Sequence, residues 1–490
     1  MDGRRTITRT TTWGGGHEDR IAIGIGVAIG GIVTFIAANY EMRWIMLILI
    51  VALVTAVFAV VPNKHRLLFG IYLLAFQADL NLYLLHRSES GSIGTSGPPG
   101  IRLPFVFLAA MAYAAYEVFT GRLNLGRIDW GQPVTKYFAW LVVLALLSLI
   151  AAPERFIGLC AIFNLVQLWL IYLVTLNVLR SEDDVRRAMN LLMVSLLIQC
   201  LLYFLQVSMG TSFDLLGEVR ETGQGGLPRH GGTVSMRAAD FASFIMPLTL
   251  IATARNFTAT TISERRKFGV LTSFGVAAII LTFTRAAWVG TLMGSTVLLV
   301  MCVRRRMLST RTLVKLGAVA IMLVIAFFPL IKQRLGDNHS SAFDEREALM
   351  QMAQNIIVAR PVLGAGIGNY SFVVRDYLTR DLEDKWLWIV HNNYLLRAAE
   401  NGIPALLLYL ALLWAMVRRA IRSTHTRDPA LQAIGLGWTC GMIALVWEMY
   451  WDIWQGFPYN ALMWMLWGMT GAMLRIRSEA PDATAAATPR

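Results

Sequence analysis

The residues best suited to chemistry are a few arginines and one histidine that stand between long apolar segments. Arg285 lies in the sequence Thr-Phe-Thr-Arg-Ala-Ala-Trp, where two apolar segments meet with almost no loop between them. A cation in so tight a turn is costly unless it reaches water or an anionic partner. The position fits either a side chain that extends to the membrane surface or one that binds an anionic ligand.

A second group of cations lies in the glycine-rich segment 225–233 and just after it. Arg229 has no acidic residue on its own turn, which favours a ligand phosphate as its partner. Arg237 stands three residues before Asp240, so an ion pair between these two is the simpler interpretation. We therefore keep Arg237 as the alternate to Arg229 for binding a phosphate.

The only histidine in a comparable setting is His391, where a long hydrophilic loop returns to an apolar segment. A histidine near its ordinary pKa can act as a general base at neutral pH, although a hydrogen-bonded structural histidine fits the same position. Glu400 lies inside the apolar segment and needs a partner, which Arg397 three residues earlier could supply. Arg346, within the long loop, is a further cation on this side.

The chain that must position these residues has the composition of a membrane protein. Of its 490 residues, 56% are hydrophobic and 15% are charged, and the mean hydropathy is +0.54. These values exclude a disordered chain, a coiled coil and a disulfide-stapled secreted domain. The four cysteines lie in apolar segments without a CxxC pair, and no set of residues has metal-ligand spacing. We therefore expect no metal site and no cofactor.

Fourteen apolar segments of nearly membrane-spanning length predict an all-α polytopic membrane protein with 12–14 transmembrane helices. The segments are 21–38, 45–61, 67–85, 104–119, 137–152, 157–179, 188–208, 238–254, 268–284, 286–303, 313–331, 396–417, 431–450 and 458–474. Gln77 and Asp79 interrupt the third segment. The Lys and Arg residues concentrate in alternate loops, which predicts a cytoplasmic N-terminus and explains the net charge of +13 without nucleic acid. We expect no cleavable signal peptide.

This topology divides the chain into six predicted parts. They are a cytoplasmic N-terminal tail at 1–20, N-terminal transmembrane helices at 21–208, core transmembrane helices at 209–331 that include a short outer loop at 209–237, a long outer loop at 332–391, C-terminal transmembrane helices at 392–474 and a cytoplasmic tail at 475–490. The division places all the candidate site residues on the outer side of the membrane or at its edge.

The long loop has the pattern of a helical cap. A helix is predicted from Ser341, because a capping residue and acidic residues precede Leu349, Met352 and Ile356 at helical spacing. Pro361 is expected to end it. The glycine-rich segment 364–369 follows no strand and is not GxGxxG, so a tight turn is a better interpretation than a nucleotide site.

Taken without any family comparison, these features predict an outward-facing pocket with several arginines and one histidine. Arginines in a pocket at the membrane suit a phosphate or diphosphate ligand. An outward-facing enzyme without a nucleotide motif needs a substrate that carries its own activation energy. A lipid-linked diphosphate sugar meets this requirement.

Four local patterns together resemble the O-antigen ligase and O-antigen polymerase superfamily of bacterial envelopes. They are Arg229-x-x-Gly-Thr followed by Ala-Asp-Phe-Ala at 239–242, the turn at 282–288, Arg346 followed by 359–370, and His391-Asn-Asn followed by Glu400-x-Gly402. They cover roughly 229–417. The sequence departs from the usual pattern at Thr284, where serine is common, at Ala286, where glycine is common, and at Asp240, where asparagine is common.

The resemblance implies a glycosyltransferase-C-like, metal-independent, inverting enzyme of the bacterial inner membrane with a periplasmic active site. The donor would be a glycan on undecaprenyl diphosphate. Arg229 and Arg285 would bind the diphosphate, with Arg237 as the alternate and Arg346 in a weaker role. His391 would be the general base, and Arg397 and Glu400 would support the site.

The resemblance leaves more than one function open. An O-antigen ligase would transfer the glycan to the lipid A core of lipopolysaccharide, and the His-Asn-Asn pattern with one large cap loop slightly favours this branch. An O-antigen or exopolysaccharide polymerase would transfer it to the next lipid-linked repeat. A flippase or other transporter of lipid-linked oligosaccharides is the alternative from another class, but we find no internal repeat and no charge cluster at mid-membrane.

Overall fold

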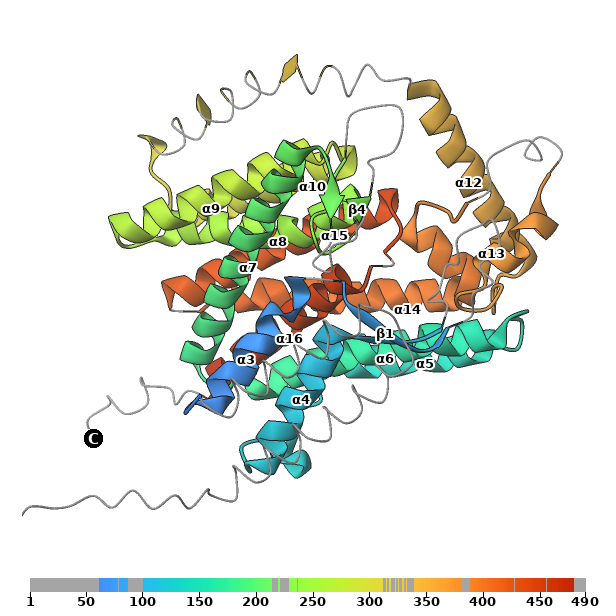
Figure 1. Ribbon diagram of the computed structural model, residues 1–490, viewed down its shortest axis with the longest axis horizontal. Helices are drawn as coiled ribbons and strands as arrows, with labels where there is room; N and C mark the ends of the chain where they lie inside the picture. The colour runs from blue at the N-terminus through green and yellow to red at the C-terminus, as the bar shows by residue number, and fades with distance from the viewer. Residues whose placement is uncertain are drawn as a thin grey trace, which may run out of the picture.

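The computed structural model is a helical bundle with a smaller helical cap at one end (Figure 1). The structure describes residues 61–77, 79–86, 100–213, 219–220, 229–235, 237–311, 339–379, 388–426, 428–454 and 456–479, together with isolated positions between 314 and 332. The predicted spans at 21–38 and 45–61 lie outside the described residues, as does most of the span at 313–331.

Helices form nearly all of the described chain, because its apolar segments can satisfy their backbone groups internally. The helices are α3 Lys64–Leu74, α4 Phe105–Phe119, α5 Val134–Ser148, α6 Arg155–Val178, α7 Glu182–Met209, α8 Ala238–Thr258, α9 Ile262–Leu281, α10 Arg285–Arg304, α12 His339–Ala359, α13 Tyr370–Val373, α14 Asn393–Ser423, α15 Pro429–Trp451 and α16 Phe457–Glu479. Short 3-10 turns lie at Ala75–Gln77, Leu125–Arg127 and Val374–Tyr377. Two small antiparallel sheets pair β1 Asn81–His86 with β2 Gly100–Pro104, and β3 Ser212–Phe213 with β4 Val219–Arg220.

The prediction of an all-α polytopic membrane protein is confirmed. Within the described residues, the five helices α6, α7, α10, α14 and α15 are long and apolar enough to cross a membrane. The total of 12–14 spans stays a prediction. The segment predicted as a span at 67–85 is instead the short helix α3 followed by strand β1. Its interruption at Gln77 has a physical role, because the Gln77 side chain bonds Ser195 and Gln199 of α7.

The centre of the bundle is α8, which lies between α9, α10 and α15 (Figure 1). Nearly every side chain from Ala238 to Ala254 is buried. The close approach of α15 depends on Gly437 and Gly441, where an added Cβ would meet the α8 backbone at Ile251 and Pro247. Since α8 begins at the pocket described below, this packing fixes one wall of the site.

Polar contacts between helix ends fall into two groups that match the predicted sides of the membrane. At one end Arg186 pairs with Asp428 at 2.6 Å, and Arg475 donates to the carbonyl oxygen of Leu179 at 2.7 Å. At the other end the Asn369 side chain accepts from the backbone N–H of Glu154 at 2.8 Å. The distribution of Lys and Arg predicts that the two segments of each pair lie on the same side of the membrane. Which end is cytoplasmic stays a prediction.

The expected helical cap is present between residues 339 and 379. Its helix α12 begins at His339, two residues before the expected start, and ends before Pro361 as expected. Leu349, Met352 and Ile356 are buried in a small core of their own, which confirms the predicted apolar face. The cap is therefore a packed unit that can hold a side chain of α12 over the bundle.

The segment 364–369 is the tight turn that the sequence predicts, and it fastens the cap to α14. Gly364 and Gly366 have φ values of 66° and 96°. The backbone N–H groups of Ala365 and Gly366 donate to the carbonyl oxygens of Ala399 and Glu400, each at 2.8 Å. At Gly402, α14 breaks with φ 81°, and the Ile403 N–H donates to the Pro361 carbonyl at 2.8 Å.

Gly402 should therefore be intolerant of any side chain. A Cβ there would meet the backbone of Val362, and the left-handed conformation costs a non-glycine residue about 1–2 kcal/mol before any clash. We expect Gly402→Ala to lower the thermal unfolding midpoint of the purified protein in detergent. Gly70→Ala is the control, because nothing lies within 4 Å of a Cβ at that helical position. Equal midpoints for the two variants would contradict the strain argument.

Candidate active site

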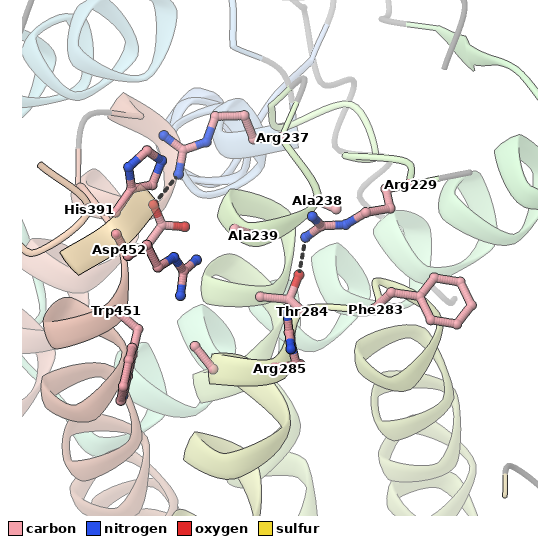
Figure 2. Close-up of a pocket in the computed structure, with 12 residues that line it drawn as sticks. Arg229, Arg237, Ala238, Ala239, Phe283, Thr284, Arg285, His391, Trp451 and Asp452 are labelled. Carbon is pink, nitrogen blue, oxygen red and sulfur yellow. Dashed lines mark hydrogen bonds and ion pairs between the residues drawn. The ribbon is translucent and has the colours of Figure 1, made fainter. Parts of the chain in front are cut away.

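A cavity of about 340 Å³ opens where α8, α10 and α15 reach the cap. Its volume lies in the range of roughly 300–1,000 Å³ that is typical of ligand sites. The residues that line it are Arg229, Arg237, Ala238, Ala239, Phe283, Thr284, Arg285, Ala286, Arg346, His391, Trp451 and Asp452 (Figure 2). Five of the seven residues predicted for the site, His391 and four arginines, are thus brought together from four separate segments.

Arg285 enters the cavity from a strained turn between α9 and α10. Phe283 has φ 52°, which is uncommon for a non-glycine residue and is often associated with functional sites. The indole N–H of Trp288 braces the turn by donating to the carbonyl oxygens of Ile279 and Ile280 at 3.1 Å. Because Arg285 is the first residue of α10, its guanidinium adds to the positive end of the helix dipole. The turn is therefore suited to an anion.

Arg229 lies beside this turn and is oriented by it (Figure 2). Its Nε donates to the carbonyl oxygen of Thr282 at 3.2 Å, and its NH2 group donates to Oγ1 of Thr284 at 3.1 Å. The next residue, His230, is buried and accepts or donates a hydrogen bond with Ser212 at 3.0 Å. The structure therefore holds the Arg229 guanidinium next to the start of α10.

Arg237 has two carboxylate partners within the protein. It contacts Asp452 at 2.6 Å and Asp240 at 3.4 Å. The predicted ion pair with Asp240 is confirmed, and the shorter contact with Asp452 adds to it. Two carboxylates satisfy this guanidinium, so Arg237 is less suited than Arg229 to bind a phosphate.

His391 lies two residues before α14 and faces the cavity beside Asp452 (Figure 2). Burial lowers the pKa of His391 below its ordinary value of 6.5, and the charges of Arg237 and Arg346 act in the same direction. The negative charge of Asp452 opposes this shift. The imidazole is therefore neutral at pH 7 and can accept a proton.

The remaining predicted residues differ in their positions. Arg346 lies on α12 of the cap and reaches the cavity from the side opposite the bundle. Arg397 and Glu400 are not among the lining residues. Arg397 packs over the ring of Tyr409 at 5.8 Å, and the Glu400 carboxylate accepts from the backbone N–H of Tyr370 at 3.4 Å. These contacts stabilise α14 and the turn at 364–369 and do not involve the cavity itself.

Sequence reasoning gave little weight to two residues that line the cavity, Trp451 and Asp452. Trp451 is one of a group of C-terminal tryptophans, a pattern typical of membrane-interface anchors, and Asp452 is a single acidic residue near the predicted outer face. Their position at the end of α15 could have been predicted, but their partners on α8 and on the loop before α14 could not. In the described part of the chain, no three His, Cys, Asp or Glu side chains are placed to hold a metal ion.

The fold and the cavity define a multi-pass membrane protein with an arginine-rich site at one end of its bundle. Residues 269–410 match the model of a family described as O-antigen ligase, which supports the predicted resemblance to the O-antigen ligase and polymerase superfamily. The matched segment includes Arg285, Arg346 and His391. No curated protein matches the chain.

Among solved structures, the chain is similar to one described under "Structural coordination of polymerization and crosslinking by a peptidoglycan synthase complex". The sequence identity is 17%, and the alignment covers 72% of this chain and 99% of the other, with a TM-score of 0.40. This overall likeness is too low to transfer any residue or activity.

The charge environment of His391 gives a test that does not depend on any substrate. Because burial lowers its pKa, modification of the neutral imidazole by diethyl pyrocarbonate should fall to half only below pH 6.5. Removing a cation with Arg346→Ala should raise this midpoint, and removing the anion with Asp452→Asn should lower it. Peptide mass spectrometry across pH would measure all three, and shifts of the same sign in both variants would refute the proposed electrostatics.

Proposed function

We propose that the protein is a glycosyltransferase that moves a glycan from undecaprenyl diphosphate to an acceptor hydroxyl at the periplasmic face of the inner membrane. The preferred reaction is O-antigen ligation to the lipid A core. One observation carries the proposal: Arg229, Arg285, Arg346 and His391 come from four separate segments and line the same cavity. The family match supports the reaction class.

The arginines suit the diphosphate of the donor. The lining residues carry four guanidinium groups and one carboxylate, so they present a surplus of positive charge to a ligand. Guanidinium groups bind phosphate oxygens through two hydrogen bonds at once. In the proposed reaction, Arg285 and Arg229 stabilise the negative charge that develops on the diphosphate as it leaves. Arg346 reaches the same ligand from the cap.

His391 suits the acceptor. In the proposed step its neutral imidazole takes the proton of the acceptor hydroxyl, and the oxygen attacks the anomeric carbon of the donor. The bond between that carbon and the diphosphate oxygen breaks, and undecaprenyl diphosphate leaves. A single displacement of this kind inverts the anomeric carbon. Because the arginines stabilise the negative charge on the leaving diphosphate, the step as written requires no metal ion.

The proposed orientation has a cytoplasmic N-terminus and places the cavity in the periplasm. The clustering of Lys and Arg in the opposite loops supports this orientation. The contacts between helix ends agree with the predicted grouping of the loops into two sides, since they pair segments that the charge bias assigns to the same side. A lipid-linked donor presented on the periplasmic leaflet would meet the cavity at the membrane edge.

The two central residues can be tested directly. We expect Arg285→Ala and His391→Ala each to reduce glycan transfer by a factor of about 10² or more, which is the usual effect of removing a charge-stabilising donor or a general base. Arg266→Ala is the matched control, because Arg266 is exposed at the far end of the same helix pair. Transfer would be measured in membranes with equal amounts of each variant, with and without a chelator, which we expect to have no effect.

Full activity in the Arg285 or His391 variant would remove that residue from the mechanism. Loss of activity with chelator, restored by a divalent cation, would refute the metal-independent reaction. Loss in the Arg266 variant as well would indicate a general effect on folding or insertion.

The polymerase is the closest alternative, because its donor chemistry is the same. Deleting the gene should distinguish the two by their lipid-linked intermediates. For a ligase, long glycan should disappear from the lipid A core and accumulate on undecaprenyl diphosphate. For a polymerase, the lipid-linked pool should collapse to single repeats. For a flippase, unpolymerised lipid-linked glycan should accumulate on the cytoplasmic leaflet, and labelled lipid should move across proteoliposomes that contain the wild-type protein.

A further inference from the structure

Two aromatic residues line the charged cavity, Phe283 and Trp451. Phe283 is buried and its ring points away from the other lining side chains (Figure 2), whereas Trp451 offers an aromatic face to the cavity. It is the last residue of α15 and directly precedes Asp452. Figure 2 shows its indole on the side of α15 that faces the start of α10, where Arg285 lies. The residue lines the cavity and is only partly buried.

The indole is held rigidly by two aromatic neighbours on its own helix. The ring of Tyr450 lies 5.1 Å from it in an edge-to-face arrangement, and the ring of Trp447 lies 5.8 Å away at a tilt. Trp447 in turn lies beside α10, where a Cβ on Gly290 would be 3.5 Å from its Cδ1 atom. Aromatic contacts of this kind fix a ring in place, so a ligand need not order it on binding.

A guanidinium over the indole would cover the aromatic face in a cation–π contact. Among the described residues, the cation–π contacts lie elsewhere, for example Arg360 over Tyr377 and Arg397 over Tyr409. The arginines of the cavity are directed to other partners: Arg229 to the α9–α10 turn and Arg237 to Asp452. The face of Trp451 is thus a flat apolar surface next to an anion site.

We propose that Trp451 is the platform on which the first sugar ring of the donor stacks. The inference rests on the proposed function, which places the diphosphate at Arg285 and Arg229. In a cavity of about 340 Å³, the group next to the diphosphate is the sugar bonded to it. A pyranose ring has an apolar face of C–H groups that fits an aromatic surface, while its hydroxyl groups point outward to polar side chains. Trp451 therefore selects donors that carry a sugar over undecaprenyl diphosphate itself.

The test measures equilibrium binding of two labelled lipids to purified protein in the His391→Ala background, where no transfer occurs. The lipids are undecaprenyl diphosphate and the host's undecaprenyl-diphosphate-linked glycan. We expect Trp451→Leu to weaken binding of the glycan-bearing lipid about tenfold and to leave binding of undecaprenyl diphosphate unchanged. Trp451→Phe, which keeps an aromatic face, should retain most of the preference.

The matched control is Trp414→Leu, which makes the same change at an exposed position of α14 that does not line the cavity. Equal losses in the two leucine variants would overturn the proposal in favour of membrane anchoring. Weaker binding of a soluble acceptor glycan instead of the donor would overturn it in favour of an acceptor site. If neither lipid binds to any of these proteins, all of which retain Arg285, the proposed function itself is refuted. If both lipids bind and the change at Trp451 has no effect, only this inference is refuted.

Discussion

The ion pair between Arg237 and Asp452 is the contact on which the geometry of the site depends. It joins the residue that precedes α8 to the residue that follows α15, and these two helices form the tightest packing in the bundle. Asp452 also accepts from the N–H of Ile453 at 2.7 Å, which fixes the carboxylate. Charges at the edge of a membrane are stable only when they are paired or hydrated. The pair therefore fixes one side of the cavity, which the other cations also line.

Around this ion pair, the chain uses strained or glycine-dependent backbone wherever two elements must approach closely. The left-handed conformation of Phe283 lets α9 and α10 meet with a three-residue turn, and the turn places Arg285 at the cavity. The glycines at 364–368 let the cap approach the α14 backbone. The packing of the surrounding helices stabilises these conformations, and the result is that Arg346 and His391 reach the same cavity from different directions.

Much of this could be predicted from local sequence. Arg285 and the cap helix were evident because apolar periodicity and the distribution of Lys and Arg are properties of short segments. The partners of Arg237 and Arg397 were predicted less well. The first gains Asp452, which is 215 positions away, and the second, expected to partner Glu400, packs over the ring of Tyr409. Such contacts depend on how helices pack, and sequence spacing alone does not contain that information. The apolar segment at 67–85 failed as a span for the same reason, because Gln77 finds its partners on α7.

The position of the cavity bears on how a lipid-linked donor would reach it. Below Arg285, the outer face of α10 is apolar and exposed, with Val289 at 42%, Leu292 at 67% and Val300 at 45% of their full accessible surface. Under the proposed function, an isoprenoid chain could lie along this face while its diphosphate meets the first turn of the same helix. At a rise of about 1.5 Å per residue, α10 from Arg285 to Arg304 spans about 30 Å, the thickness of the hydrocarbon core. One helix would then contact both the diphosphate and the part of the isoprenoid chain next to it, and the charged site would need no path through the bundle.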